Sequence, residues 1–257
     1  MRRVTPCTLM LTVFIAAAPT FAEAGEENVA KSETIASLPP SKDVGGVWVT
    51  PDGARVAYTV RSDAGQELRI DGKAVASGQV VALPVFSPDG KRWATVVKTE
   101  KGFFAVVDGQ AGDTCESVGR PCFSPCGRHL AFGVKAGGKS TMVLDGKPGE
   151  AYENVSPPNF SPDGSRLAYR AFGDKGQFTV VDGKAFGPHF YADTPVWSPD
   201  GKRFAFLGKD KADSPRFLVV DGVRREAPGA EGWVLFSPDG KRYACVEKSG
   251  DGFRLAS

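Results

Sequence analysis

The sequence predicts an all-β protein made of six repeated antiparallel sheets, and three observations lead to this expectation. The phrase Ser-Pro-Asp-Gly, or a close variant, occurs six times, with starts 37 residues apart except for a final step of 39. An Asp-Gly pair follows each of the first five phrases at a nearly constant distance. Short, strongly apolar segments fill the intervals. A repeat of this length is a supersecondary unit that must stack on its neighbours to bury its apolar faces.

The first repeated phrase predicts a turn. It occupies residues 50–53, 87–90, 124–127, 161–164, 198–201 and 237–240. Proline fixes φ at the first central position, Ser and Asp bond nearby backbone amides, and Gly tolerates the left-handed conformation. We therefore expect structural roles for Asp52, Gly53, Asp89, Gly90, Asp163, Gly164, Asp200, Gly201, Asp239 and Gly240. A ring of aspartates that binds a cation is the alternative, but the third copy carries Cys126, and this replacement favours turn capping.

The second repeated pair, Asp-Gly, is the dipeptide best suited to a two-residue hairpin turn. It begins at Asp71, Asp108, Asp145, Asp182 and Asp221. In the unit 85–121, we expect strands at 85–86, 92–97 and 103–107, a polar loop at 99–102, and a weaker fourth strand within 110–118.

Strand composition selects the architecture. The strand at 103–107 and its equivalents are continuous apolar runs, whereas a sheet with one wet face alternates apolar and polar residues. Radially packed blades cover both faces of each strand, so the sequence predicts a six-bladed β-propeller of four-stranded blades. The expected blades lie near 47–84, 85–121, 122–158, 159–195, 196–233 and 234–257. A parallel β-solenoid is the second choice, and the dense Pro and Gly punctuation disfavours helical repeats.

The last unit ends before its Asp-Gly pair and therefore supplies three strands. Residues 25–46 precede the first blade, and 34–38 is their apolar piece. We expect this segment to pair with 253–256 and close the last blade, which would cover two open strand edges. The alternative is a truncated chain whose ring stays open.

The N-terminus predicts export. Two arginines, an apolar stretch at 8–19 and the small-residue pattern Ala22, Glu23, Ala24 form the layout of a signal peptide at 1–24. We expect a periplasmic or secreted protein with no transmembrane span after cleavage. Cleavage leaves 30 Lys and Arg against 29 Asp and Glu, and this balance argues against a partner that is nucleic acid or an anionic membrane.

No catalytic or metal constellation stands out. Residues 133–140 match the phosphate-loop pattern Gly-x₄-Gly-Lys-Ser, but a strand at 141–144 follows where a helix is required. The chain has two histidines, and processing would leave Cys115, Cys122, Cys126 and Cys245, which the blade geometry predicts to be unbridged. We expect no cofactor, no metal and no enzymatic activity.

The phrase at 161–168, Ser-Pro-Asp-Gly-Ser-Arg-Leu-Ala, resembles the WD-like repeats of TolB-type β-propellers, and the likeness extends over about 47–257. The resemblance implies a periplasmic binding or scaffold module. TolB itself has an additional N-terminal α/β domain, which the residues before the first blade cannot supply.

We therefore expect a non-enzymatic recognition scaffold whose partner is an envelope or extracellular protein, or a small ligand. The loops between second and third strands vary most between repeats and are the expected working surface. Their candidate contact residues are Lys98, Lys101, Lys135, Lys139, Lys175, Lys209, Lys211 and Lys248. The alternatives are an enzyme that acts on carbohydrate or peptide at the propeller axis, and a structural role in an envelope assembly.

Overall fold

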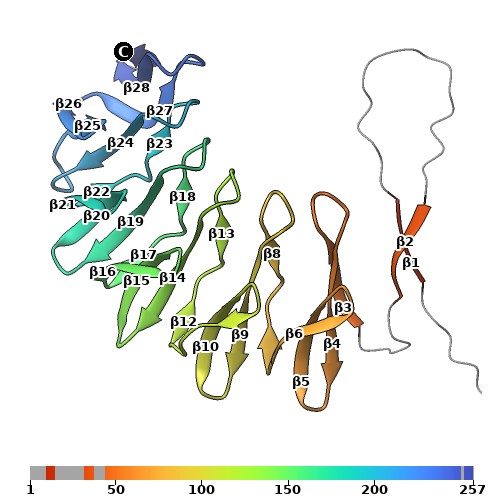
Figure 1. Ribbon diagram of the computed structural model, residues 1–257. Helices are drawn as coiled ribbons and strands as arrows, with labels where there is room; N and C mark the ends of the chain where they lie inside the picture. The colour runs from red at the N-terminus through yellow and green to blue at the C-terminus, as the bar shows by residue number, and fades with distance from the viewer. Residues whose placement is uncertain (1–9, 15–31, 38–43, 250–251, 257) are drawn as a thin grey trace, which may run out of the picture. The chain divides into compact units, whose positions relative to one another are not determined.

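The computed structural model describes residues 10–14, 32–37, 44–249 and 252–256 (Figure 1). Every regular element in them is a strand, so the all-β prediction is confirmed. The described residues include no helix that is long and apolar enough to cross a membrane. The chain divides into two compact units: Met1–Lys101 with Ala105–Gly112, and Gly102–Phe104 with Asp113–Ser257.

The sheets that begin in the first unit follow the expected repeat after an N-terminal pair. The pair is β1 (Met10–Phe14) with β2 (Ser32–Ser37). The next sheet has the order β3 (Val44–Val49), β4 (Val56–Ser62), β5 (Gly65–Ile70), β6 (Lys73–Gly78). The following one contains β7 (Val80–Val81), β8 (Val85–Phe86), β9 (Trp93–Thr99), β10 (Gly102–Val107) and β11 (Gln110–Ala111).

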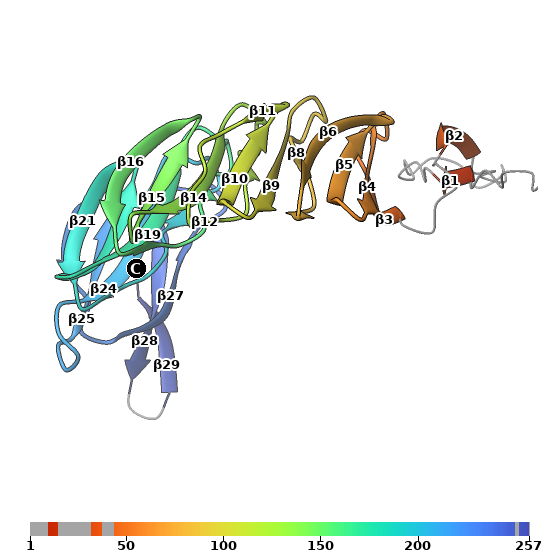
Figure 2. The ribbon, with the colours of Figure 1, turned by 90° about the horizontal axis from the view of Figure 1, so that it is seen from below.

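The second unit contains four further sheets, which stack face to face in sequence order (Figures 1 and 2). The first contains β12 (Ser117–Val118), β13 (Cys122–Phe123), β14 (Leu130–Ala136), β15 (Lys139–Leu144) and β16 (Lys147–Tyr152). The second contains β17 (Asn154–Val155), β18 (Asn159–Phe160), β19 (Leu167–Gly173), β20 (Gly176–Val181) and β21 (Lys184–His189). The third contains β22 (Tyr191–Ala192), β23 (Val196–Trp197), β24 (Phe204–Lys209), β25 (Arg216–Val220) and β26 (Val223–Glu226). The last contains β27 (Ala230–Phe236), β28 (Tyr243–Ser249) and β29 (Gly252–Ala256).

In four sheets the strand that comes first in sequence, called the inner strand below, is split into two short strands that pair with the same neighbour. In the second sheet of this unit, β17 and β18 both pair with β19, and residues 156–158 separate them. Pro157 and Pro158 lie in this break, and proline has no N–H to donate to a ladder. This sheet therefore begins a few residues before the blade boundary that we expected at 159.

In the second unit, the core lies between successive sheets. Along β19, Leu167, Tyr169 and Ala171 belong to a cluster with residues of the preceding sheet, whereas Ala168 packs with the following sheet. All four are at most 6% exposed, as the continuous apolar pattern requires. Burying a large apolar side chain contributes about 1.5–3 kcal/mol, so the sheet of β19 is stabilised mainly by its two neighbours.

The structure does not show the expected closure of the ring. The last sheet has three strands, and in the described part of the chain β29 pairs with β28 alone. The strand β2, which includes most of the expected closing segment, pairs instead with β1. The reason is that β1, an apolar strand within the expected signal peptide, offers β2 a free edge at short sequence distance. Leu38 of that segment lies outside the described residues.

Candidate functional site

The Ser-Pro-Asp-Gly turns use their aspartates internally. The Ser161 hydroxyl donates to Asp163 Oδ1 at 2.5 Å and accepts from the backbone N–H of Arg166 at 3.0 Å. Hydrogen bonds from the hydroxyls of Ser161 and Ser165 lower the pKa of Asp163 to about 2. The corresponding turn hydroxyl also lowers the pKa of Asp52, Asp89, Asp200 and Asp239. Each carboxylate is thus engaged within its own turn.

The Asp-Gly aspartates tie a hairpin turn to the strand beside it. Asp182 accepts from the backbone N–H of Leu167 at 3.0 Å through Oδ1 and from Arg166 Nε at 2.8 Å through Oδ2. All five aspartates have φ between 49° and 52°, a left-handed conformation that a type I′ turn requires. They are Asp71, Asp108, Asp145, Asp182 and Asp221.

Other sequence motifs have simple places in the fold. The phosphate-loop match is the hairpin β14–β15, with Gly137 and Gly138 at positive φ in its turn. All four described cysteines are free. Within the described ranges, no group of three or more His, Cys, Asp or Glu side chains is placed to hold a metal ion.

The predicted loop lysines are spread over several hairpins. Seven of the eight are exposed, and Lys209 is half-buried. Lys139 forms an ion pair with Glu153 and lies 4.0 Å from Asp174 of the next hairpin. The structure therefore uses at least one of these lysines to link neighbouring loops.

Sequence reasoning missed an exposed position of the inner strands, which lies in the break between the two short strands in four sheets and within β27 in the last. It lies three residues before the aromatic or apolar residue that leads into each turn. Its occupants are Leu83, Arg120, Pro157, Thr194 and Trp233, and all five are exposed. The backbone position repeats while the side-chain chemistry changes, and this variation was a signal available in the sequence.

Trp233 is the most exposed large apolar side chain of the described residues, at 78%. A bulge in β27 between Ala230 and Val234 places it there, with Gly232 at φ 94°. Bulges re-aim side chains in this way at many functional sites. Trp233 borders a cavity of about 210 Å³ that is also lined by Arg170 and Asp193.

In the cavity beside Trp233, Asp193 has partners within the chain, whereas one polar atom of Arg170 has none in the part of the chain that the structure describes. Asp193 accepts a hydrogen bond from the Tyr191 hydroxyl at 2.5 Å and lies 3.7 Å from Arg216 Nη1. Arg170 Nε is buried and has no hydrogen-bond partner among the described residues. Since a buried, unmade hydrogen bond is costly, this guanidinium is suited to an acceptor from outside the chain.

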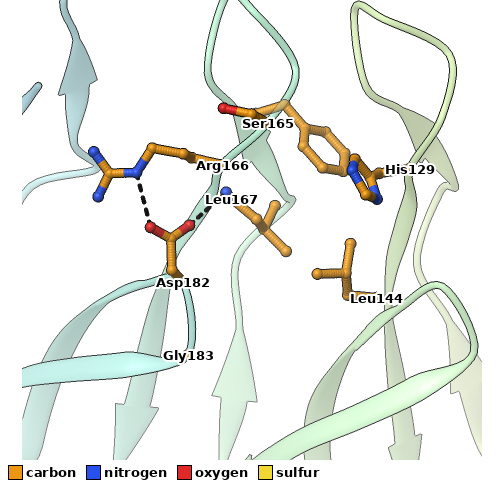
Figure 3. A pocket seen from close by; sticks show the side chains of 8 residues that line it. His129, Leu144, Ser165, Arg166, Leu167, Asp182 and Gly183 are labelled. Atoms are coloured by element: carbon orange, nitrogen blue, oxygen red, sulfur yellow. Dashed lines mark hydrogen bonds and ion pairs between the residues drawn. The ribbon is translucent and has the colours of Figure 1, made fainter. Parts of the chain in front are cut away.

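A second cavity, of about 290 Å³, lies between the sheets of β14 and β19 (Figure 3). His129 borders it on one side, and His129 Nδ1 lies 2.6 Å from Asp145 Oδ2. Arg166 and Asp182 face each other on the other side, away from His129 (Figure 3). Leu144, Phe160 and Leu167 give the cavity an apolar wall.

Comparison with known proteins finds a similarity to one family. A family model described as "Lipoprotein LpqB beta-propeller domain" matches residues 21–125. Residues 21–125 are thus similar to a β-propeller domain. The predicted likeness to TolB-like propeller repeats is confirmed by this match. Among curated proteins, none matches the sequence.

Several solved structures are similar to this chain at low identity. TolB from Acinetobacter baumannii is 19% identical with a TM-score of 0.36, and the match covers 78% of this chain and 60% of TolB. The β-propeller domain of the Trilobed protease from Pyrococcus furiosus is 16% identical with a TM-score of 0.37, covering 83% and 81%. An oligogalacturonate lyase in complex with manganese is 13% identical with a TM-score of 0.37, covering 85% and 78%. The chain thus spans less than two thirds of the length of TolB.

Proposed function

We propose that this chain is an exported, non-enzymatic β-propeller module that recognises a protein partner in the cell envelope through its inner strands. One observation carries the proposal. The repeat position that Trp233 occupies in the last sheet is exposed in five successive repeats and holds a different side chain in each. Repeat proteins use constant backbones to present variable side chains to a partner. Exposed residues that differ at equivalent sites are therefore the natural contact residues.

The region around Trp233 supports a protein partner. Trp, Tyr and Arg are the residues most enriched among those that dominate binding energy at protein interfaces. Trp233 and Arg170 border one cavity, and Tyr191 bonds to Asp193, which lines it. The buried Arg170 Nε favours a partner that inserts a carboxylate or a backbone carbonyl here.

Export is supported by the signal-peptide layout of residues 1–24. The family model that matches residues 21–125 is described as part of a lipoprotein, which is consistent with an envelope location. N-terminal sequencing of the protein exported by its host tests this: a start at residue 25 is expected, and retention of Met1 contradicts it.

Ring closure belongs to the same proposal. Cleavage would remove β1 and leave the edge of β2 without a partner, and open edges tend to pair with other strands. Pairing of β2 with β29 would then complete a sixth blade. Deleting residues 32–37 from the processed protein should lower its melting temperature by several degrees. An unchanged melting temperature would contradict closure.

A site-specific crosslinking experiment tests the recognition surface. A photo-crosslinking amino acid is placed at Thr194, beside the Trp233 cavity, and in a matched protein at Lys175, on a loop between second and third strands. We expect one discrete adduct in envelope extract from position 194, and its loss in the variant Trp233→Ser. Equal labelling from both positions would contradict the inner-strand surface. Stabilisation by a carbohydrate or peptide that the protein turns over would favour the enzymatic alternative.

A further inference from the structure

One arginine of the repeat joins two sheets of the second unit to the sheet that follows each of them. Arg166 Nε bonds to Asp182 at 2.8 Å, and Arg166 Nη1 donates to the carbonyl of Lys202 at 2.6 Å. Its Cζ lies 5.1 Å from the ring centre of Trp197 and 5.4 Å from that of Phe204. The guanidinium is thus held by one carboxylate, one carbonyl and two ring faces.

The next interface repeats this arrangement. Arg203 Nε bonds to Asp221 at 2.8 Å, and Arg203 Nη1 donates to the carbonyl of Lys241 at 2.7 Å. Its Cζ lies 5.4 Å from the ring centre of Phe236 and 5.9 Å from that of Tyr243. The same repeat position therefore stacks a guanidinium on the following sheet in two successive interfaces.

The preceding interface has a histidine at this position. His129 contacts Asp145 as the arginines contact their aspartates. Among the described residues, its shorter imidazole does not extend to a ring or a carbonyl of the following sheet as the guanidinium groups do. Phe160 occupies the place of Trp197 and Phe236 in the repeat, and Leu167 that of Phe204 and Tyr243. Ser165 stands where Lys202 and Lys241 supply their carbonyls.

The result is the cavity of about 290 Å³, which His129, Phe160, Ser165 and Leu167 all line. Within the described part of the chain, no cation stacks on Phe160 and no group donates to the Ser165 carbonyl. A ring face and a carbonyl that bind a guanidinium in the two following interfaces are both available here.

We propose that this cavity is a binding site for the guanidinium group of an arginine side chain contributed by a partner polypeptide. The chain itself displays the occupant, because Arg166 and Arg203 fill the equivalent space. The bound group would stack on Phe160 and donate to the Ser165 carbonyl. A volume of about 290 Å³ lies just below the range of about 300–1,000 Å³ for ligand pockets, which suits one side chain.

Geometry makes the site selective for arginine. A planar guanidinium stacks on a ring while its edge N–H groups reach acceptors in the same plane, whereas a lysine ammonium cannot do both. Arg128 interacts with Cys126 and Asp163 and is not among the lining residues.

This site shares no lining residue with the cavity beside Trp233. The proposal therefore does not depend on the proposed inner-strand surface, and either can fail alone.

The test is an NMR titration of the full chain with the blocked peptide acetyl-Gly-Arg-Gly-amide. We expect saturable shifts at Phe160 and Ser165, and binding at least 10-fold weaker for the matched peptides that carry citrulline or lysine. Citrulline keeps the shape of arginine without its charge. Equal binding of the citrulline peptide, or no saturation at these residues, would overturn the proposal. Binding of free L-arginine but not of the peptide would overturn a polypeptide source.

Two variants complete the experiment. His129→Arg supplies the guanidinium from within the chain, and we expect it to weaken peptide binding at least 10-fold without lowering the melting temperature. Phe160→Leu keeps the apolar wall but removes the ring face, and we expect a loss of similar size. If the first variant does not fold, the second still decides: unchanged peptide binding by a folded Phe160→Leu protein would refute the stacking site.

Discussion

The two faces of the sheet that contains β19 are built from the same repeat positions but differ in chemistry. Toward the following sheet, Arg166 fills the interface with a stacked and hydrogen-bonded guanidinium. Toward the preceding sheet, His129 stops short and a cavity of about 290 Å³ remains. The comparison teaches that in a stacked repeat one substitution can open a pocket while the backbone stays the same. Each interface is an independent site for change because each sheet contacts only its neighbours.

The interface that contains the cavity is closely packed at its turns, and glycine substitutions test this packing. Gly164 has φ 73°, and a Cβ there would lie 2.8 Å from the backbone nitrogen of Cys126 on the preceding sheet. Gly183, which lines the cavity, has φ 79° but nothing within 4 Å of a Cβ. We expect Gly164→Ala to lower the free energy of unfolding by about 3 kcal/mol, from left-handed strain of about 1–2 kcal/mol and a backbone clash.

Gly183→Ala is the matched control, since it has the strain without the clash and should cost about 1 kcal/mol. Urea unfolding of both variants measures the difference. Equal losses would mean that the turns of adjacent sheets are not in tight contact at Gly164.

Removing the stacked arginine should have the next largest effect. Arg203→Ala removes two carbonyl hydrogen bonds, an ion pair with Asp221 and two ring contacts. Hydrogen bonds to charged groups contribute about 1.5–3 kcal/mol when buried, but Arg203 is 30% exposed, so we expect a loss of about 2 kcal/mol. For a chain of this size, that loss lowers the melting temperature by roughly 4–8 °C.

His129→Ala is the equivalent change in the open interface. It removes the contact of 2.6 Å between His129 Nδ1 and Asp145 Oδ2, whose side chains are both 38% exposed, and exposed contacts of this kind contribute about 0–1 kcal/mol. Calorimetry should therefore separate the two variants clearly. If His129→Ala were as destabilising as Arg203→Ala, the imidazole would be a structural contact and the comparison between the two interfaces would fail.

Much of the fold could be read from the sequence because each turn is local. The Asp-Gly pairs and the Ser-Pro-Asp-Gly phrases fix backbone geometry within a few residues, and the strands between them formed in the expected order. The split inner strands were harder to predict, since β17 and β18 contribute two residues each to the ladder on β19. Pairing of β2 was also beyond local reasoning, because it depends on which edge is free.

The candidate sites were less predictable, for a different reason. The sequence shows His129 where Arg166 and Arg203 stand in later repeats, but not what an arginine touches there. The contacts are a ring and a carbonyl of the next sheet, about 37 residues away, and they become apparent only in three dimensions. The exposure of Trp233 likewise follows from a bulge in β27 that the neighbouring residues in the sequence do not predict.

The smallest expected effect concerns Cys126, which replaces the turn aspartate in the same open interface. Hydrogen bonds from Ser124 and from the Arg128 side chain lower the pKa of the Cys126 thiol from 9.0 to about 7. Burial instead raises the pKa of Cys115, Cys122 and Cys245. Because the folded value is depressed, the thiolate stabilises the fold fully above about pH 9, and this contribution is lost as the pH falls through 7.

Alkylation measures this difference, since the thiolate is the reactive form. With iodoacetamide, the rate at Cys126, followed by mass spectrometry of its peptide, should reach half its maximum near pH 7. Cys122, half-buried on the same sheet, should react only at higher pH. Arg128→Gln removes one donor to the sulfur and should move the Cys126 midpoint toward 9. A midpoint that stays near 7 in this variant would show that the Ser124 hydroxyl and the backbone N–H of residue 128 hold the thiolate without the guanidinium. A wild-type midpoint near 9 would show that the turn does not stabilise the thiolate at all.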